Sequence, residues 1–165
     1  MSTPTPVILC GAMREVAALI RTLLLPEYNV VYAGHNLSAA EREVPLILSG
    51  SPPPPSKLHT QIGSNDFTDP PRAVITGGGY NEERFQALYQ ACTAAKNGVP
   101  PVPFFRTDNG LTDRLAATGE GPAHASAEYP AAVTRRLKEK LREAGVGEGE
   151  GRGGCFGFEG GGVCI

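Results

Sequence analysis

Four short apolar stretches of the chain are each followed by residues that could take part in catalysis or in ligand binding. Cys10 and Arg14 follow the first stretch, and His35 and Asn36 follow the second. A cysteine near a helix N-terminus can act as a nucleophile, and an imidazole can transfer protons near neutral pH. We therefore take Cys10 and His35 as candidate catalytic residues, and Arg14 and Asn36 as candidate ligand-binding residues.

The third and fourth stretches are followed by groups suited to binding a small polar or carboxylate compound. Glycine amides in front of a helix can donate hydrogen bonds, and a guanidinium can neutralise a carboxylate. These two segments complete the predicted ligand-binding set, with Gly77, Gly78, Gly79, Tyr80, Arg106 and Asp108. Thr107 and Asn109 belong to the second of these segments.

Each candidate residue also has a structural interpretation that the sequence leaves open. Cys10 could be an inert cysteine buried in a strand, and His35 a loop histidine beside a helix cap. The three glycines could form a tight turn with close backbone packing. Glu82 and Glu83 follow them at the start of a helix, where they would repel a phosphate. Arg106 could form an internal ion pair or a helix cap.

Alternating strand and helix patterns predict an α/β protein. Apolar stretches at 7–10, 29–33, 73–76 and 102–105 have the length and composition of buried strands. Apolar residues recur at helical spacing between the strands, and Pro45 should break or kink the second helix. The fourth strand contains prolines, which cannot donate to a ladder of hydrogen bonds, so we place it at an edge of the sheet.

We expect a three-layer, flavodoxin-like or Rossmann-like fold, with a four-stranded, mostly parallel sheet of order 2-1-3-4 flanked by helices. In such sheets the carboxyl ends of the strands share one edge. Ligands bind there, at the point where the strand order reverses. The candidate site residues should therefore meet at the carboxyl edge of the sheet.

A single domain is expected over residues 1–144. A proline-rich loop at 50–72 joins the second helix to the third strand, so it should lie at the N-terminal edge of the sheet, as a docking segment or a linker. Its His59 has no obvious partner in the sequence. Residues 145–165 contain ten glycines among 21 residues, which predicts a flexible tail.

Composition excludes several classes of function. Hydrophobic residues make up 41% of the chain, which is enough for a core, and 15 basic residues stand against 17 acidic ones. Without a concentrated basic face we expect no nucleic-acid partner. Arg14, Glu15 and Arg21 interrupt the most apolar stretch, so we expect no membrane segment and a cytoplasmic location. Four scattered cysteines with no CxxC spacing predict no metal site.

The stretch from Val7 to Met13 resembles the phosphocysteine loop of sugar-phosphotransferase IIB components. The resemblance implies a phosphate carried on Cys10, but Arg14 and Glu15 replace the hydroxyl-rich residues that cradle phosphate in that family. The low-molecular-weight tyrosine phosphatases share the layout, yet their Cys-x5-Arg spacing falls on Val16. The nicotinamide fingerprint is also incomplete, so we predict no cofactor and assign no family.

Two functions remain open from the sequence. In the first, the protein binds, and in the strongest form transforms, a small polar or carboxylate ligand at the carboxyl edge of the sheet. In the second, it is a non-catalytic protein-interaction module with a degenerate nucleotide-binding-like fold. Its proline-rich loop or its tail would then contact a protein partner, since polyproline segments bind aromatic grooves.

Overall fold

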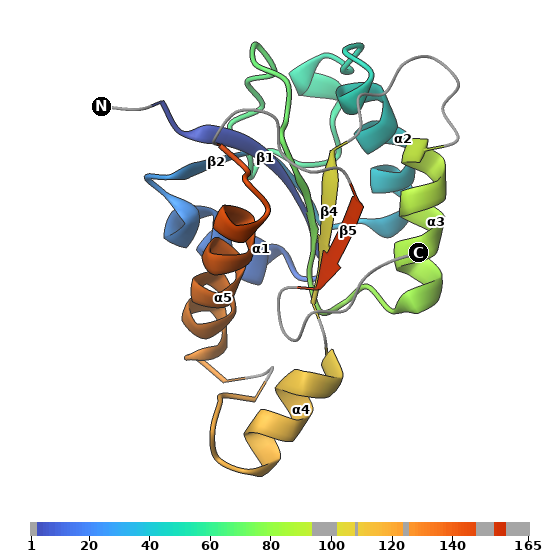
Figure 1. Ribbon diagram of the computed structural model, residues 1–165. Helices are drawn as coiled ribbons and strands as arrows, with labels where there is room; N and C mark the ends of the chain where they lie inside the picture. The colour runs from blue at the N-terminus through green and yellow to red at the C-terminus, as the bar shows by residue number, and fades with distance from the viewer. Residues whose placement is uncertain (1–2, 94–101, 108, 124–125, 148–153, 158–165) are drawn as a thin grey trace.

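A computed structural model describes residues 3–93, 102–107, 109–123, 126–147 and 154–157. Strands and helices alternate along the chain, except that two helices follow the fourth strand, and a 3-10 turn lies in the proline-rich loop (Figure 1). The elements are β1 (Thr5–Cys10), α1 (Arg14–Leu24), β2 (Tyr28–Gly34), α2 (Leu37–Leu48), η1 (Pro55–Lys57), β3 (Val74–Thr76), α3 (Glu82–Thr93), β4 (Pro103–Arg106), α4 (Asn109–Ala117), α5 (Tyr129–Glu143) and β5 (Gly154–Gly157).

The strands form one parallel sheet in the order β2-β1-β3-β4-β5. The first four strands confirm the predicted order. β5 is an addition from the glycine-rich segment, and it pairs with the outer side of β4. The prediction that β4 lies at the sheet edge is therefore wrong. Pro103 is the first residue of β4, so the later residues of the strand keep the N–H groups that a ladder requires. Residues 148–153 and 158–165 of the predicted tail lie outside the described residues.

Helices cover both faces of the sheet. α1 and α5 lie on one face, and α2 and α3 pack together on the other (Figure 1). Side chains of a strand alternate between the faces, so Val7 and Leu9 enter the core beneath α1 and α5, whereas Ile8 and Cys10 enter the core beneath α2 and α3. This alternation decides which face each candidate side chain can reach.

The second helix continues through its proline. α2 runs to Leu48, so the chain does not break at Pro45, which was one of the two effects predicted for this proline. Val44 and Ile47 are buried in the core beneath α2, and their packing outweighs the missing N–H of the proline. The helix is capped by Asn36, whose side-chain oxygen accepts a hydrogen bond from the N–H of Ala39 at 2.9 Å.

The proline-rich loop packs along the free edge of β2. The N–H groups of Ser64 and Asn65 donate to the carbonyls of Val30 and Val31 at 3.1 and 2.8 Å. The Thr60 hydroxyl donates to a carbonyl near the carboxyl end of the strand, that of Ala33, at 2.7 Å. The middle of the loop follows β2 toward the carboxyl end of that strand. It thereby covers a strand edge that would otherwise expose unpaired backbone groups.

Candidate functional site

A cavity of about 460 Å³ opens at the carboxyl edge of the sheet, on the face covered by α1 and α5. Leu9 and Ile75, from the neighbouring strands β1 and β3, form its floor. Apolar side chains of α1 and α5 form two of its walls, among them Val16, Ala17, Ile20, Val133 and Leu137. The interior is thus largely apolar, as in most small-molecule sites.

Backbone turns and α4 form the polar part of the lining. The turns are 11–13 after β1 and 77–79 after β3. A side chain at Gly79 would collide with Ala12, so the two turns lie against each other only because this residue is glycine. The close backbone packing that the sequence left open as a structural interpretation is thus present at Gly79. α4 lies beyond the carboxyl ends of the strands (Figure 1) and contributes Asn109 and Asp113.

Asn109 is held by the glycine turn. Its side-chain Nδ2 donates to the carbonyl of Gly78 at 2.8 Å. Its Oδ1 is buried and accepts no hydrogen bond from any residue in the described part of the chain. Thr107, just before α4, donates its hydroxyl to the carbonyl of Thr76 at 3.1 Å. The sequence places Thr107 and Asn109 at this edge, but nothing in it shows that they line a cavity.

The predicted site residues divide between the two faces of the sheet. Four of them line the cavity, namely Cys10, Gly77, Gly78 and Gly79. Five others do not belong to the lining, namely Arg14, His35, Asn36, Tyr80 and Arg106. Asp108 lies outside the described residues. The cavity instead includes Tyr129 and the apolar face of α5, which sequence reasoning did not connect with a site.

The Cys10 side chain belongs to the core beneath α2 and α3. It is fully buried, and this burial, with a smaller contribution from Cys92, raises the pKa of the Cys10 thiol well above its usual range. The Tyr80 hydroxyl, itself buried, forms a hydrogen bond with this thiol. A nucleophilic cysteine needs a lowered pKa and access to a substrate. The geometry therefore agrees with the interpretation of Cys10 as an inert cysteine buried in a strand.

Arg106 forms the ion pair that was one of its two predicted interpretations. Its Nη2 lies 2.5 Å from the Oε2 of Glu82, and its guanidinium lies 4.8 Å from the centre of the Phe85 ring. The hydrogen bond from Arg106 is the largest cause of a lowered Glu82 pKa. Both partners belong to α3, so the guanidinium lies on the face of the sheet away from the cavity.

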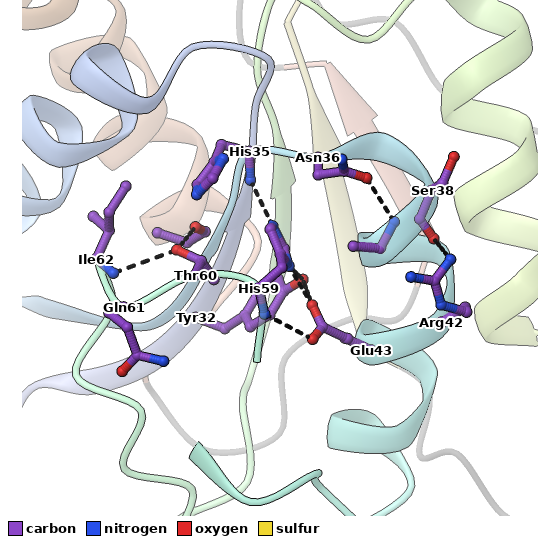
Figure 2. A network of polar contacts seen from close by, with 12 residues as sticks. Tyr32, His35, Asn36, Ser38, Arg42, Glu43, His59, Thr60, Gln61 and Ile62 are labelled. Carbon is purple, nitrogen blue, oxygen red and sulfur yellow. Dashed lines mark hydrogen bonds and ion pairs between the residues drawn. The ribbon is translucent and has the colours of Figure 1, made fainter. Parts of the chain in front are cut away.

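His35 lies beside a second histidine at the carboxyl end of β2 (Figure 2). Its backbone N–H donates to His59 Nε2 at 3.2 Å, and the two rings meet edge to face with centres 4.9 Å apart. Because Nε2 of His59 accepts this bond, its ring proton is on Nδ1, which donates to Glu43 Oε1. His59, for which the sequence suggested no partner, thus joins the proline-rich loop to α2.

Tyr32, His35, Glu43 and His59 form one cluster of polar side chains. Glu43, which comes from α2, lies at its centre. It is 8% exposed and accepts hydrogen bonds from the Tyr32 hydroxyl at 3.0 Å and from the His59 N–H at 3.2 Å (Figure 2). Burial, together with the nearby Cys10 and Glu43, raises the pKa of Tyr32 strongly. Tyr32 therefore stays protonated and keeps donating at any ordinary pH. The cluster ties the loop to the domain, and none of its members lines the cavity.

We expect His35 to make stability depend on pH. Burial, and then the nearby His59 and Arg14, lower the pKa of His35 below its ordinary value. The unfolded chain therefore binds a proton before the folded one does, and stability falls as the pH drops below about 6.5. Urea unfolding at pH 7.5 and 5.5 should show a smaller acid-induced loss for His35→Asn than for the wild type. An equal loss in both proteins would contradict this role.

Comparison with known proteins identifies one relative. The chain is 30% identical over 143 residues to a protein of Aspergillus oryzae named Kojic acid related protein 6, and the match covers 84% of this chain and 76% of the relative. No family model and no solved structure matches the chain. Among the described residues, no helix is long and apolar enough to cross a membrane, and no three His, Cys, Asp or Glu side chains gather as metal ligands would.

Proposed function

This chain belongs to the family of Kojic acid related protein 6, and we propose that it binds a small uncharged molecule in the cavity at the carboxyl edge of its sheet. The cavity itself is the observation that supports this proposal. Its volume of about 460 Å³ is within the range of small-molecule sites, and it lies where parallel α/β sheets bind ligands.

The lining favours a neutral ligand over a carboxylate or a phosphate. Asp113 lines the cavity, and the described lining includes no lysine or arginine. Arg106, the guanidinium expected to neutralise an anion, is paired with Glu82 on the other face. An anion in the cavity would lose its hydration against a mostly apolar lining that offers no lysine or arginine. The ligand that fits best has an apolar body and a small polar end.

The name of the relative suggests the first compound to test. Kojic acid is a compact ring compound that carries oxygen groups and no permanent charge. We propose to measure the thermal stability of the purified protein with kojic acid, with other neutral ring compounds, and with matched carboxylates and phosphates. A ligand at a hundred times its Kd should add roughly 2.7 kcal/mol to the free energy of unfolding. For a domain of this size the melting temperature should rise by roughly 5–10 °C.

A bulky residue in the wall should reduce binding. Val16 is half-buried in the cavity lining, so the Val16→Trp side chain should occupy space that the ligand needs. We expect at least a tenfold loss of affinity in calorimetric titration, about 1.4 kcal/mol. Ala18→Trp is the matched control, because Ala18 is exposed on the same helix and does not line the cavity. Equal binding by both variants would place the ligand elsewhere.

If no compound of the panel binds, the proposal fails, and the interaction-module hypothesis becomes the better one. Deleting residues 51–56 would then test the proline-rich loop as a docking segment. This part of the loop is partly exposed, and it precedes the segment that packs on β2. A partner that still binds the shortened protein would exclude the loop as its docking site.

A further inference from the structure

We infer that residues 51–57 of the proline-rich loop are a docking segment for a protein partner, whose groove is lined by aromatic side chains and flanked by a carboxylate. This inference goes beyond the proposed function and does not depend on it. None of these residues lines the cavity. Leu58, which follows them, belongs to the core beneath α2 and α3, on the other face of the sheet. The partner can therefore bind whether the cavity is empty or filled.

Two consecutive prolines of this segment, Pro54 and Pro55, lie on the surface. Both are exposed, whereas Pro52 and Pro53 are partly buried. The backbone at Pro54 has φ −53° and ψ 136°, close to polyproline II, and the 3-10 turn Pro55–Lys57 follows. Domains that recognise polyproline II segments dock such prolines in grooves lined by aromatic side chains. The exposed pair has the apolar surface that a groove of this kind binds.

The structure holds the segment at both ends. At its start, the N–H of Ser51 donates to the carbonyl of Leu46 in α2 at 2.9 Å. At its end, Leu58 is 5% exposed, and the side chain of Gln61 donates to the carbonyl of Pro55 at 2.8 Å. The partner therefore meets a segment that is already ordered. Binding then costs little of the entropy that is lost when a flexible chain is fixed.

Lys57 gives one end of this surface a positive charge. Its side chain is exposed and has no acidic partner among the described residues. Residues 44–65 contain no Asp or Glu, so no carboxylate near it in the sequence neutralises it. A carboxylate beside the partner's groove would pair with Lys57, and charge pairs of this kind fix the orientation of two partners. We therefore expect a groove of the SH3 type with acidic side chains at its rim, in preference to an uncharged aromatic groove.

Titration of purified SH3 domains into the isotope-labelled full chain tests this inference. We expect at least one domain to bind, with the largest changes in the amide resonances of Ser51, Ser56 and Lys57. The double variant Pro54→Ala, Pro55→Ala should bind at least tenfold more weakly, because the groove loses both pyrrolidine rings. Pro70→Ala is the matched control. Pro70 is an exposed proline of the same loop outside the segment, so its replacement should leave binding unchanged.

The charge is tested separately from the prolines. Lys57→Glu should also weaken binding at least tenfold, and added salt should weaken binding by the wild type. Arg84→Glu, which reverses an exposed cation on α3, is the control and should bind as the wild type does. If Lys57→Glu binds as tightly as the wild type, no carboxylate of the partner pairs with this lysine, and the inferred partner is wrong.

Other results would also overturn the inference. One is that no SH3 domain binds the wild type, and another is that binding survives in the double proline variant. A third is that only purified WW or EVH1 domains bind, which would assign the segment to a different class of partner. Because both prolines are exposed, we expect the double variant to melt close to the wild type. If it does not fold, Lys57→Glu still decides the question.

Discussion

Replacing Glu43 by alanine should lower the free energy of unfolding by about 3–5 kcal/mol, because three donors lose their acceptor at once and each unsatisfied buried donor costs about 1–3 kcal/mol. Glu43 is 8% exposed and accepts hydrogen bonds from the Tyr32 hydroxyl, the His59 N–H and the His59 ring. Alanine leaves these three donors without an acceptor in a partly buried site. Urea unfolding at pH 7.5, followed by circular dichroism, would measure the loss.

The loop should respond more strongly than the rest of the domain. His59 is the point at which Glu43 holds the proline-rich loop, so Glu43→Ala should accelerate amide exchange at Ser64 and Asn65, which donate to β2. Glu139→Ala, an exposed substitution on α5, is the control and should change stability by less than about 0.5 kcal/mol. A loss below about 1 kcal/mol for Glu43→Ala would show that water replaces the carboxylate with little cost.

Gly63→Ala should destabilise the protein by about 2–3 kcal/mol, because it forces a methyl group into the backbone of β2. A Cβ at this position would lie 2.6 Å from the carbonyl oxygen of Val31 and 2.9 Å from the Cα of Tyr32. Neither atom can move without disturbing the sheet edge on which the loop packs. For a chain of this length the melting temperature should fall by roughly 5–10 °C.

Gly11→Ala provides the control for this substitution. A Cβ at Gly11 would have no neighbour within 4 Å, and the backbone there is not in the left-handed region. We therefore expect a change of less than about 0.5 kcal/mol in the free energy of unfolding. If the two alanine variants are equally stable, the loop does not lie against β2 as closely as the structure shows. Scanning calorimetry of both proteins under one buffer condition would decide this.

The first four strands, the helices and the order of those strands could be predicted because they depend on local patterns. Apolar stretches of strand length alternate with helical periodicity, and right-handed crossovers leave few possible orders for a parallel sheet. Pro45 shows the limit of a local rule. Its effect on α2 depends on how well Val44 and Ile47 pack against the sheet, and that packing is not a property of the helix sequence alone.

The edge of the sheet that holds the cavity was also predictable, but the face was not. Parallel strands place their carboxyl ends together, which brings Cys10, the glycine turn and Arg106 to one edge. Successive side chains of a strand point to opposite faces, so Leu9 and Ile75 form the cavity floor while Cys10 and Arg106 point toward α2 and α3. Which face of the sheet carries the cavity depends on how α4 and α5 are placed. No local sequence pattern encodes that placement.

The sequence by itself determined the α/β class, the strand order and the edge at which a site should lie, because hydrophobic periodicity and chain connectivity act over short distances. Only the tertiary structure decided which candidate residues meet. Glu43 and His59 are 16 residues apart and belong to a helix and a loop, and Asn109 and Gly78 are 31 residues apart and belong to a helix and a turn. Such contacts form because the folded sheet brings these segments together, and the buried polar groups must then find partners among the groups nearby.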